Sequence, residues 1–433
     1  NATLLTAGSQ TITATDTVSS SIAGTSNAIA VSAGAASHFT ISTPAAATAG
    51  APFTITVTAL DAFNNVAMSY DGIIHFTSSD GAATLPPNSS LTNGTGSFSA
   101  TLRTAGSQTI TANDGSISVT SNPIAVGAAA ATHFTIATPA SANAGAAFSI
   151  TVTAFDGFNN VASSYGGTIH FTSSDGTATL PGNSTLTGGS GSFSATLRTA
   201  GSQTITASDG SISITSNPIA VAAAAAAHFT IAAPPSAVAG APVSVSVTAF
   251  DSSNNIVTNY GGTIHFTSSD ALALLPADAM LANGTGTFNA TLNTAGSQTI
   301  TATDSGNAAI SGTSGAIAVA AAAPAIATLS LTTGLTTGGL SVTITGTSLA
   351  GATLVTFGGV AATIVSSNAT SIVVTTPAHA AGAVDVVVVT PGGTATAASA
   401  FTFVAQIPTL SFWMLILLGL TLATIATVRM GGL

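Results

Sequence analysis

Histidine is the side chain in this sequence that could most readily bind a metal or transfer a proton, and six of its seven copies fall at repeated positions. A metal site would need two imidazoles close in space with carboxylate or further histidine partners, and sequence spacing alone does not provide that. We interpret the repeated histidines as strand residues on half-exposed faces, and His379 as a turn residue. The repeated positions are His38, His133, His228, His75, His170 and His265.

Aspartate and asparagine recur together in three short loops, of which Asp61-Ala62-Phe63-Asn64-Asn65 is the first. Their oxygen atoms are ligands that calcium accepts. Each loop carries only one charge, however, and hairpin turns use the same residues for side-chain hydrogen bonds and left-handed backbone. We favour the turn interpretation and keep calcium as the alternative. The candidate calcium ligands are Asp61, Asn64, Asp156, Asn159, Asp251 and Asn254.

The composition provides few side chains that could carry out catalysis. Of 433 residues only 4% are charged: there are 13 Asp, no Glu, three Arg and no Lys, and the net charge is −10. Nucleic-acid binding needs clustered Lys and Arg, so we expect no such partner. Cysteine is absent, and the Ser-rich strands lack the strand-turn-helix context of a serine nucleophile. We therefore predict a protein that is not an enzyme and that has no catalytic residue and no cofactor.

The elements that would position these residues are strands. Hydrophobic residues make up 46% of the chain, and in segments such as 53–59 they alternate with Thr, which gives one packed face and one wet face. Landmarks including Asp61, Asp156 and Asp251 repeat with a period of 95 residues, the size of a small domain. About seven short strands in each period predict an all-β chain of antiparallel two-sheet sandwiches.

These units resemble the bacterial immunoglobulin-like repeats of adhesin-type surface proteins, through pieces such as Tyr-x-Gly-x-Ile-x-Phe-x-Ser-Ser-Asp and Thr-Ala-Gly-Ser-Gln-Thr-Ile-Thr-Ala. The resemblance covers residues 1 to about 322 and implies tandem immunoglobulin-like sandwiches that act as spacers or binding modules at the cell surface. We expect full repeats at 36–130, 131–225 and 226–322, with residues 1–35 forming the C-terminal part of another.

The first residues match the second half of a repeat, because residues 2–14 correspond to residues 100–112. Two interpretations remain open. The numbered chain is the C-terminal part of a longer repeat protein, or these strands complete a sandwich in another subunit by strand addition.

After residue 322 the repeat pattern stops. The segment 323–405 resembles an IPT/TIG domain, another immunoglobulin-like sandwich, through pieces such as Val355-Thr356-Phe357-Gly358-Gly359-Val360. Its glycine pairs suit tight hairpins that need positive φ, and Pro377 follows a predicted strand, where its missing donor does least harm.

Residues 410–428 contain no charge and are long enough to cross a membrane as one α-helix. Trp413 and Arg429 would anchor the two ends at the membrane interfaces. Together with the motif Ile407, Pro408, Thr409, Leu410 and Ser411, the segment 406–433 resembles the IPTL-CTERM sorting signal of Gram-negative bacteria. That resemblance implies a sorting protease as a partner, so the helix is either processed or retained as an anchor.

The sequence thus predicts an extracellular or cell-surface protein of a Gram-negative bacterium, acting as a stalk or an interaction array. An extracellular ligand such as a glycan or matrix component, or a second copy of the chain, would be its partner. The alternatives are a self-assembling subunit of a surface layer, sheath or filament, and an accessory subunit of a membrane complex held by the retained helix.

Overall fold

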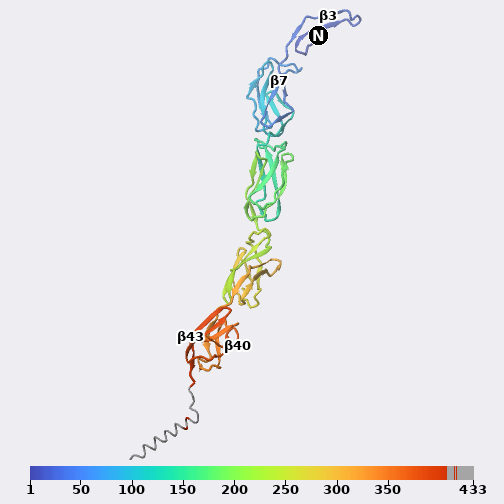
Figure 1. Ribbon diagram of the computed structural model, residues 1–433. Coiled ribbons are helices and arrows are strands. Elements are labelled where there is room, and N and C mark those ends of the chain that lie inside the picture. Colours follow the sequence, from blue (N-terminus) through green and yellow to red (C-terminus); the bar gives the residue numbers. More distant parts are fainter. Residues whose placement is uncertain (407–413, 415, 417–433) are drawn as a thin grey trace, which may run out of the picture. The chain divides into compact units, whose positions relative to one another are not determined.

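The computed structural model describes residues 1–406, together with Met414 and Ile416. The chain divides into two compact units, residues 1–224 and residues 225–433. Strands are the only regular elements from residue 1 to residue 406, so the prediction of tandem all-β sandwiches is confirmed for this part. Figure 1 shows each sandwich as a bundle of strands of its own, with β7 (Pro52–Leu60) in the first full repeat and β43 (Gly393–Val404) in the last module.

The first full repeat contains ten strands, and its sheets have the orders β10-β7-β5, β11-β14-β6 and β13-β12-β8-β9. All its strand pairs are antiparallel except β6 with β14, which is parallel. The strands are β5 (His38–Ser42), β6 (Ala46–Thr48), β7 (Pro52–Leu60), β8 (Ile73–Ser78), β9 (Ser89–Ser90), β10 (Thr95–Thr101), β11 (Gly106–Gln108), β12 (Ile110–Asn113), β13 (Ser118–Thr120) and β14 (Ile124–Gly127).

The second and third full repeats have the same strand order and sheet topology. The second contains β15 (His133–Ala137), β16 (Ser141–Asn143), β17 (Ala147–Phe155), β18 (Thr168–Ser173), β19 (Ser184–Thr185), β20 (Ser190–Thr196), β21 (Gly201–Gln203), β22 (Ile205–Ser208), β23 (Ser213–Thr215) and β24 (Ile219–Ala222). The third contains β25 (His228–Ala232), β26 (Ser236–Val238), β27 (Pro242–Phe250), β28 (Thr263–Ser268), β29 (Ala279–Met280), β30 (Thr285–Thr291), β31 (Gly296–Gln298), β32 (Ile300–Asp304), β33 (Ser311–Thr313) and β34 (Ile317–Ala320).

Each repeat has ten strands where the sequence predicted about seven. The additional ones are two or three residues long, such as β6 and β9. A segment this short cannot establish a period of two in the sequence, so the alternation that marks the longer strands is missing from it.

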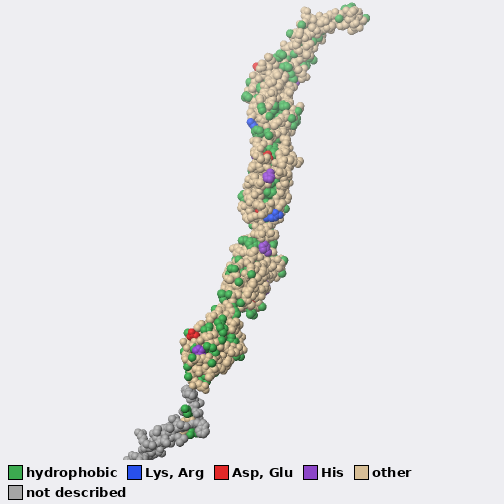
Figure 2. All heavy atoms as spheres, in the orientation of Figure 1, with side chains coloured by type: hydrophobic (Ala, Val, Ile, Leu, Met, Phe, Trp, Pro, Cys, Tyr) green, Lys and Arg blue, Asp and Glu red, His purple; other side chains and the backbone are tan. Residues whose placement is uncertain are grey.

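Alternation determines which side chains enter the core. In β7 the side chains of Ile55, Val57 and Ala59 are fully buried, while the Thr side chains between them lie on the other face. Those hydroxyls also bond across the sheet, as between Thr56 Oγ1 and Ser97 Oγ at 3.2 Å. On the face that Figure 2 shows, charged side chains are isolated spots on a surface of other atoms. Hydroxyls therefore take the place of charge on the wet faces.

Each repeat contains one tyrosine that packs against a core phenylalanine and donates a hydrogen bond to an aspartate. Tyr165 packs edge-on against Phe134, with ring centroids 5.4 Å apart, and its hydroxyl donates to Asp209 Oδ2 at 2.6 Å. Burial, followed by this hydrogen bond to a carboxylate, raises the pKa of Tyr165 well above its usual range. Tyr70 and Tyr260 donate in the same way to Asp114 and Asp304.

Residues 1–35 form only β1 (Gly8–Gln10), β2 (Thr13–Thr15), β3 (Ala23–Thr25) and β4 (Ile29–Val31), in two sheets of two strands each. β1 pairs with β4 as β11 pairs with β14, and β2 pairs with β3 as β12 pairs with β13. The segment thus has the strand pairing of the second half of a repeat.

The C-terminal module is a second kind of sandwich, with sheets in the orders β35-β37-β41-β40 and β36-β43-β42-β38-β39. Gly358 and Gly359 have positive φ in the two-residue hairpin between β38 and β39, and Pro377 follows β41, as predicted. Its strands are β35 (Ala325–Leu329), β36 (Thr333–Leu335), β37 (Ser341–Thr347), β38 (Leu354–Phe357), β39 (Val360–Ala361), β40 (Thr363–Ser367), β41 (Ser371–Thr375), β42 (Gly382–Thr390) and β43 (Gly393–Val404).

The predicted sorting motif at 407–411 lies outside the described residues, as do Trp413, Arg429 and all but two residues of the predicted membrane span 410–428. Within the described part of the chain, no helix has both the length and the apolar character needed to cross a membrane.

The tyrosine-aspartate pair provides a test of what holds one repeat together. We expect Tyr165→Phe to destabilise the second repeat by about 1.5 kcal/mol, because a hydrogen bond to an ionised partner is lost. Hydrogen exchange of the β22 amides measures this loss. The first repeat keeps Tyr70 and is the internal control, so equal loss of protection in β12 and β22 would contradict the assignment.

Candidate functional site: the repeat junction

The Asp61 loop is built around one buried carboxylate, whose residue is only 2% exposed. Oδ1 accepts the backbone N–H of Phe63 at 2.9 Å and of Asn65 at 2.9 Å. Oδ2 accepts the N–H of Gly34 at 2.9 Å and the side-chain amide of Asn65 at 2.9 Å. The carboxylate therefore satisfies loop donors that would otherwise be buried without partners.

The same loop geometry recurs around Asp156 and Asp251. Asp156 accepts from the backbone of Phe158 at 2.8 Å and from Asn160 Nδ2 at 2.9 Å. The residue before the last Asn is left-handed each time, with φ of 68° at Asn64, 64° at Asn159 and 63° at Asn254. Asparagine tolerates this conformation better than most residues, so the loops have the turn geometry that the sequence analysis favoured.

The candidate calcium ligands in each loop come together only in part. Asp61 and Asn64 share a loop, but Asn64 Oδ1 lies 3.1 Å from His38 Nε2, while the carboxylate oxygens of Asp61 accept N–H groups. Among the described residues, no group of three or more His, Cys, Asp or Glu side chains is arranged to hold a metal ion. Calcium binding at these loops stays the alternative to the turn interpretation.

Asn65, the last residue of the loop, reaches the preceding strands. Its Oδ1 accepts the backbone N–H of Ala7 at 2.8 Å, and its Nδ2 donates to the carbonyl of Leu5 at 2.8 Å. One carboxamide thus binds two backbone groups of residues 5–7 as a neighbouring peptide would. We call this pair of hydrogen bonds the asparagine clasp.

The clasp is repeated at the next junction. Asn160 Oδ1 accepts the N–H of Ala105 at 2.8 Å, and Asn160 Nδ2 donates to the carbonyl of Arg103 at 2.8 Å. The Arg103 guanidinium carbon also lies 5.8 Å from the centroid of the Phe158 ring, within the range of a cation-π contact. The same atoms therefore join the first repeat to residues 1–35 and the second repeat to the first.

A second buried carboxylate holds the other side of the clasp. Asp80 accepts the N–H of Arg103 at 2.6 Å, the N–H of Thr104 at 3.0 Å and the Thr104 hydroxyl at 2.7 Å. A continuous chain of polar contacts consequently runs from Asp80 through residue 103 to Asn160 and on to Asp156. Such a network specifies one geometry because every member is satisfied.

The protonation of these carboxylates follows from their donors. Hydrogen bonding from the Asn65 side chain is the largest influence on Asp61 and, with further backbone donors, holds its pKa well below the usual range. Burial of Asp270 opposes ionisation, but donors from Thr294, Leu272 and Asn293 outweigh it and lower the pKa of Asp270 to about 2. Both groups are therefore ionised at neutral pH.

The histidines are not brought together. His75 Nδ1 lies 2.8 Å from Asn88 Oδ1 and His170 Nδ1 lies 2.9 Å from Asn183 Oδ1. In the third repeat the partner is Asp278, whose Oδ1 lies 2.8 Å from His265 Nδ1 on an exposed surface. Each of these histidines therefore contacts a neighbour within its own repeat, as expected for strand residues.

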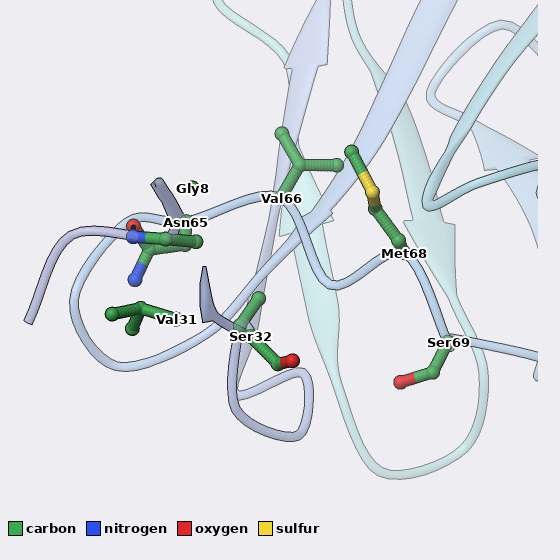
Figure 3. Close-up of a pocket in the computed structure, with 9 residues that line it drawn as sticks. Gly8, Val31, Ser32, Asn65, Val66, Met68 and Ser69 are labelled. Carbon is green, nitrogen blue, oxygen red and sulfur yellow. Dashed lines mark hydrogen bonds between the residues drawn. The ribbon is translucent and has the colours of Figure 1, made fainter. Parts of the chain in front are cut away.

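A cavity of about 570 Å³ lies beside the first clasp (Figure 3). Asn65, Val66 and Met68 line it from the first full repeat, and Val31 and Ser32 line it from residues 1–35. Figure 3 shows the Val66 and Met68 side chains projecting from one loop of the repeat. The wall is largely apolar, which suits a covering polypeptide or a small apolar group better than an ion.

The sequence analysis missed Asn65 and Asn160 as functional residues. It assigned the first Asn of each pair as the candidate, whereas the second one makes the clasp. The available signal was the constant spacing of four residues between each loop Asp and this second Asn.

Residues 324–404 match the model of the IPT/TIG domain family, so the C-terminal module is a TIG domain. No curated protein matches the chain. The solved structures that resemble it include the Escherichia coli adhesin FdeC, at 19% identity and a TM-score of 0.39, covering 66% of this chain and 99% of that one. Invasin, described as a bacterial integrin-binding protein, has 16% identity and a TM-score of 0.39, covering 84% of this chain and 79% of that one.

Domains 4–9 of the surface layer protein SbsC are similar at 17% identity and a TM-score of 0.23, covering 82% of this chain and 64% of that one. At these identities and TM-scores the similarities carry no argument about what this chain binds.

The clasp can be removed with one substitution. Asn160→Ala deletes both the acceptor of the Ala105 N–H and the donor to the Arg103 carbonyl. We expect the Ala105 amide to exchange hydrogen about tenfold faster, since a lost contact of about 1.4 kcal/mol corresponds to that factor. Asn159→Gly is the control, because residue 159 is left-handed and is not part of the clasp. Unchanged exchange at Ala105 in Asn160→Ala would show that the clasp does not stabilise the junction.

Acid should weaken the repeats through their buried carboxylates. The folded-state pKa of Asp270 is lowered from 3.8 to about 2, so its contribution is complete above pH 4 and is lost as the pH falls toward 2. We expect Asp270→Asn to destabilise the third repeat by about 2 kcal/mol at pH 7 and by much less near pH 2. Hydrogen exchange of the β32 amides at both pH values measures this, and a difference that does not depend on pH would contradict it.

Proposed function

We propose that this protein is a non-enzymatic cell-surface or extracellular protein of a Gram-negative bacterium, whose tandem immunoglobulin-like domains form a stalk or an interaction array. The domains would be residues 36–130, 131–225, 226–322 and the TIG domain at 323–405, preceded by the partial repeat 1–35. The observation that carries the proposal is the clasp, because Asn65 and Asn160 make the same two hydrogen bonds at two successive junctions.

A repeated clasp supports a mechanical role. Within residues 1–224, both clasps join the C-terminal strands of one repeat to a loop of the next, and a head-to-tail contact of this kind can be continued by adding repeats. Buried carboxylates such as Asp80 and Asp156 stiffen both sides of the clasp. An array of this kind holds a distal part away from the cell, or multiplies weak contacts into avidity.

The surface chemistry supports an uncharged partner. Outward positions on β7, such as Thr54 and Thr56, carry hydroxyls, and His75 on β8 is exposed. Hydroxyl faces offer both donors and acceptors without charge, which suits a neutral glycan or an uncharged matrix component. The ligand class proposed is therefore extracellular and neutral.

Residues 406–433 would direct the protein to the cell surface. The motif 407–411 and the apolar segment 410–428 support sorting by a membrane protease, or retention as an anchor with Trp413 and Arg429 at its ends. If the helix is retained in full, the protein would instead be an accessory subunit of a membrane complex.

A second candidate function is a self-assembling subunit of a surface layer, sheath or filament. One observation favours it: the outward faces of strands such as β7 carry Thr hydroxyls rather than charges. Lateral contacts between copies of the chain would therefore meet no charge repulsion.

We expect the purified full-length protein to be monomeric in sedimentation velocity and to bind immobilised neutral glycans or matrix preparations. Because the period is 95 residues, deleting 131–225 should preserve the remaining junction. A stalk predicts that this deletion leaves binding in solution unchanged and lowers binding by whole cells, whereas an array predicts a loss of avidity in both assays.

The outcomes separate the candidates. If the purified chain forms ordered high-mass assemblies and binds no ligand, the filament would be the supported function and the stalk or array would be wrong. Mass spectrometry of the protein from membranes determines whether the tail ends near residue 411 or retains residues 410–428. An intact tail that copurifies with other membrane helices would favour the accessory subunit.

A further inference from the structure

The end of the first repeat binds a loop of the second repeat at three positions. Gly50 lies against the Phe158 ring, so closely that a Cβ on Gly50 would overlap the ring. The Arg103 carbonyl and the Ala105 N–H bind the carboxamide of Asn160. These three positions therefore receive a ring and a carboxamide from residues that are two apart in the loop.

The third repeat has the same three positions at Gly240, Asn293 and Ala295, two periods of 95 residues further along the chain. Gly240 has a positive φ of 81°, against 78° for Gly50. Asp270 accepts the N–H of Asn293 at 2.6 Å, as the equivalent aspartate does in the first repeat. The backbone that binds the loop in the first repeat is therefore held in the same geometry in the third.

In the third repeat these positions line a cavity of about 330 Å³. Its wall also includes Ser348 and Ala350 of the TIG domain, and all of these residues lie within the compact unit of residues 225–433. Among the residues that the structure describes, neither the Asn293 carbonyl nor the Ala295 N–H has a hydrogen-bond partner. The pair of backbone groups that forms a clasp at the second junction is thus open to a ligand here.

The TIG loop at this cavity supplies neither a ring nor a carboxamide. It follows β37 and consists of residues 348–353, which lack the Asp-x-x-x-Asn spacing of the repeat loops. Leu349 is its only large side chain, and it is 0% exposed because it packs into the core of the TIG domain. The cavity therefore lies at positions equivalent to those that Phe158 and Asn160 occupy at the second junction.

We propose that this cavity is a docking site for a loop of a partner polypeptide that presents a phenylalanine and an asparagine two residues apart. The ring would lie against Gly240, and the carboxamide would bind the Asn293 carbonyl and the Ala295 N–H. Domain interfaces are common places for such sites. The site is separate from the hydroxyl faces to which the glycan proposal refers.

The open backbone groups select the chemistry of the occupant. A primary carboxamide has an acceptor and donors on one carbon atom, so it matches a carbonyl and an N–H on the same stretch of backbone, whereas a carboxylate has no donor and an ammonium group no acceptor. The chain itself contains Phe-x-Asn only at 63–65 and 158–160. Both of those loops already bind the segment before them, so the occupant is a separate polypeptide.

The test adds a head-to-tail cyclised peptide with the sequence of residues 154–162 to the full-length protein. We expect a Kd of about 1 mM or tighter, and hydrogen exchange at the Ala295 amide slowed about tenfold when the peptide is at about ten times the Kd. The peptide carrying Asn160→Leu keeps the size of the side chain without its polar atoms and should leave this exchange unchanged. The peptide carrying Phe158→Ser should bind at least about tenfold more weakly.

Two variants of the protein locate the site. Ala350→Trp fills the cavity from an exposed position of the TIG loop and should abolish the protection of Ala295. Ala361→Trp is the matched control, because Ala361 is exposed on β39 and is not in the wall of the cavity, so binding should be unchanged.

Three results would overturn the proposal. The first is unchanged exchange at Ala295 with the peptide at up to about 10 mM, well above the expected Kd. The second is protection of Ala295 that survives Ala350→Trp or that the Asn160→Leu peptide produces equally. The third is self-association of the protein without peptide that protects Ala295, because a second copy would then be the occupant.

Discussion

Buried carboxylates that accept backbone N–H groups are the interaction on which each repeat depends. Nine of the 13 Asp residues fall at three positions that recur in every repeat. At the first two, represented by Asp61 and Asp80, the carboxylate satisfies the donors of a turn; at the third, represented by Asp114, it also accepts a tyrosine hydroxyl. A turn whose donors were unpaired would cost several kcal/mol, so these charges are structural and are fixed by the backbone around them.

The junction follows from the same constraint. Asp156 accepts two hydrogen bonds from Asn160, one from its backbone N–H and one from its side-chain amide. The carboxamide held in this way reaches the backbone at Arg103 and Ala105. Because the recognised groups belong to the backbone, the clasp tolerates a change of side chain at the position it contacts. The first junction accordingly has Leu5 where the second has Arg103, and both form the same pair of bonds.

The sequence was sufficient for the sandwich and insufficient for the junction. The alternation over residues 53–59 predicted the buried and exposed faces of β7 (Pro52–Leu60), because a packed face requires that period. Asn65 was missed because its partners are backbone atoms about 60 residues away. Every residue type carries the same backbone groups, so the sequence does not show which residue Asn65 binds. The cavity beside it was missed for a similar reason, because its lining combines side chains between residues 7 and 33 with others between residues 65 and 69, and no local motif connects them.

The low charge of the chain is a consequence of where its carboxylates lie. Carboxylates used as internal acceptors cannot also interact with solvent, and the outward strand positions are filled by Thr and Ser. Hydroxyls on neighbouring strands bond to each other, as Thr151 does to Ser192 at 3.0 Å, so the faces are polar without being charged. Contacts made by such faces would be only weakly screened by salt.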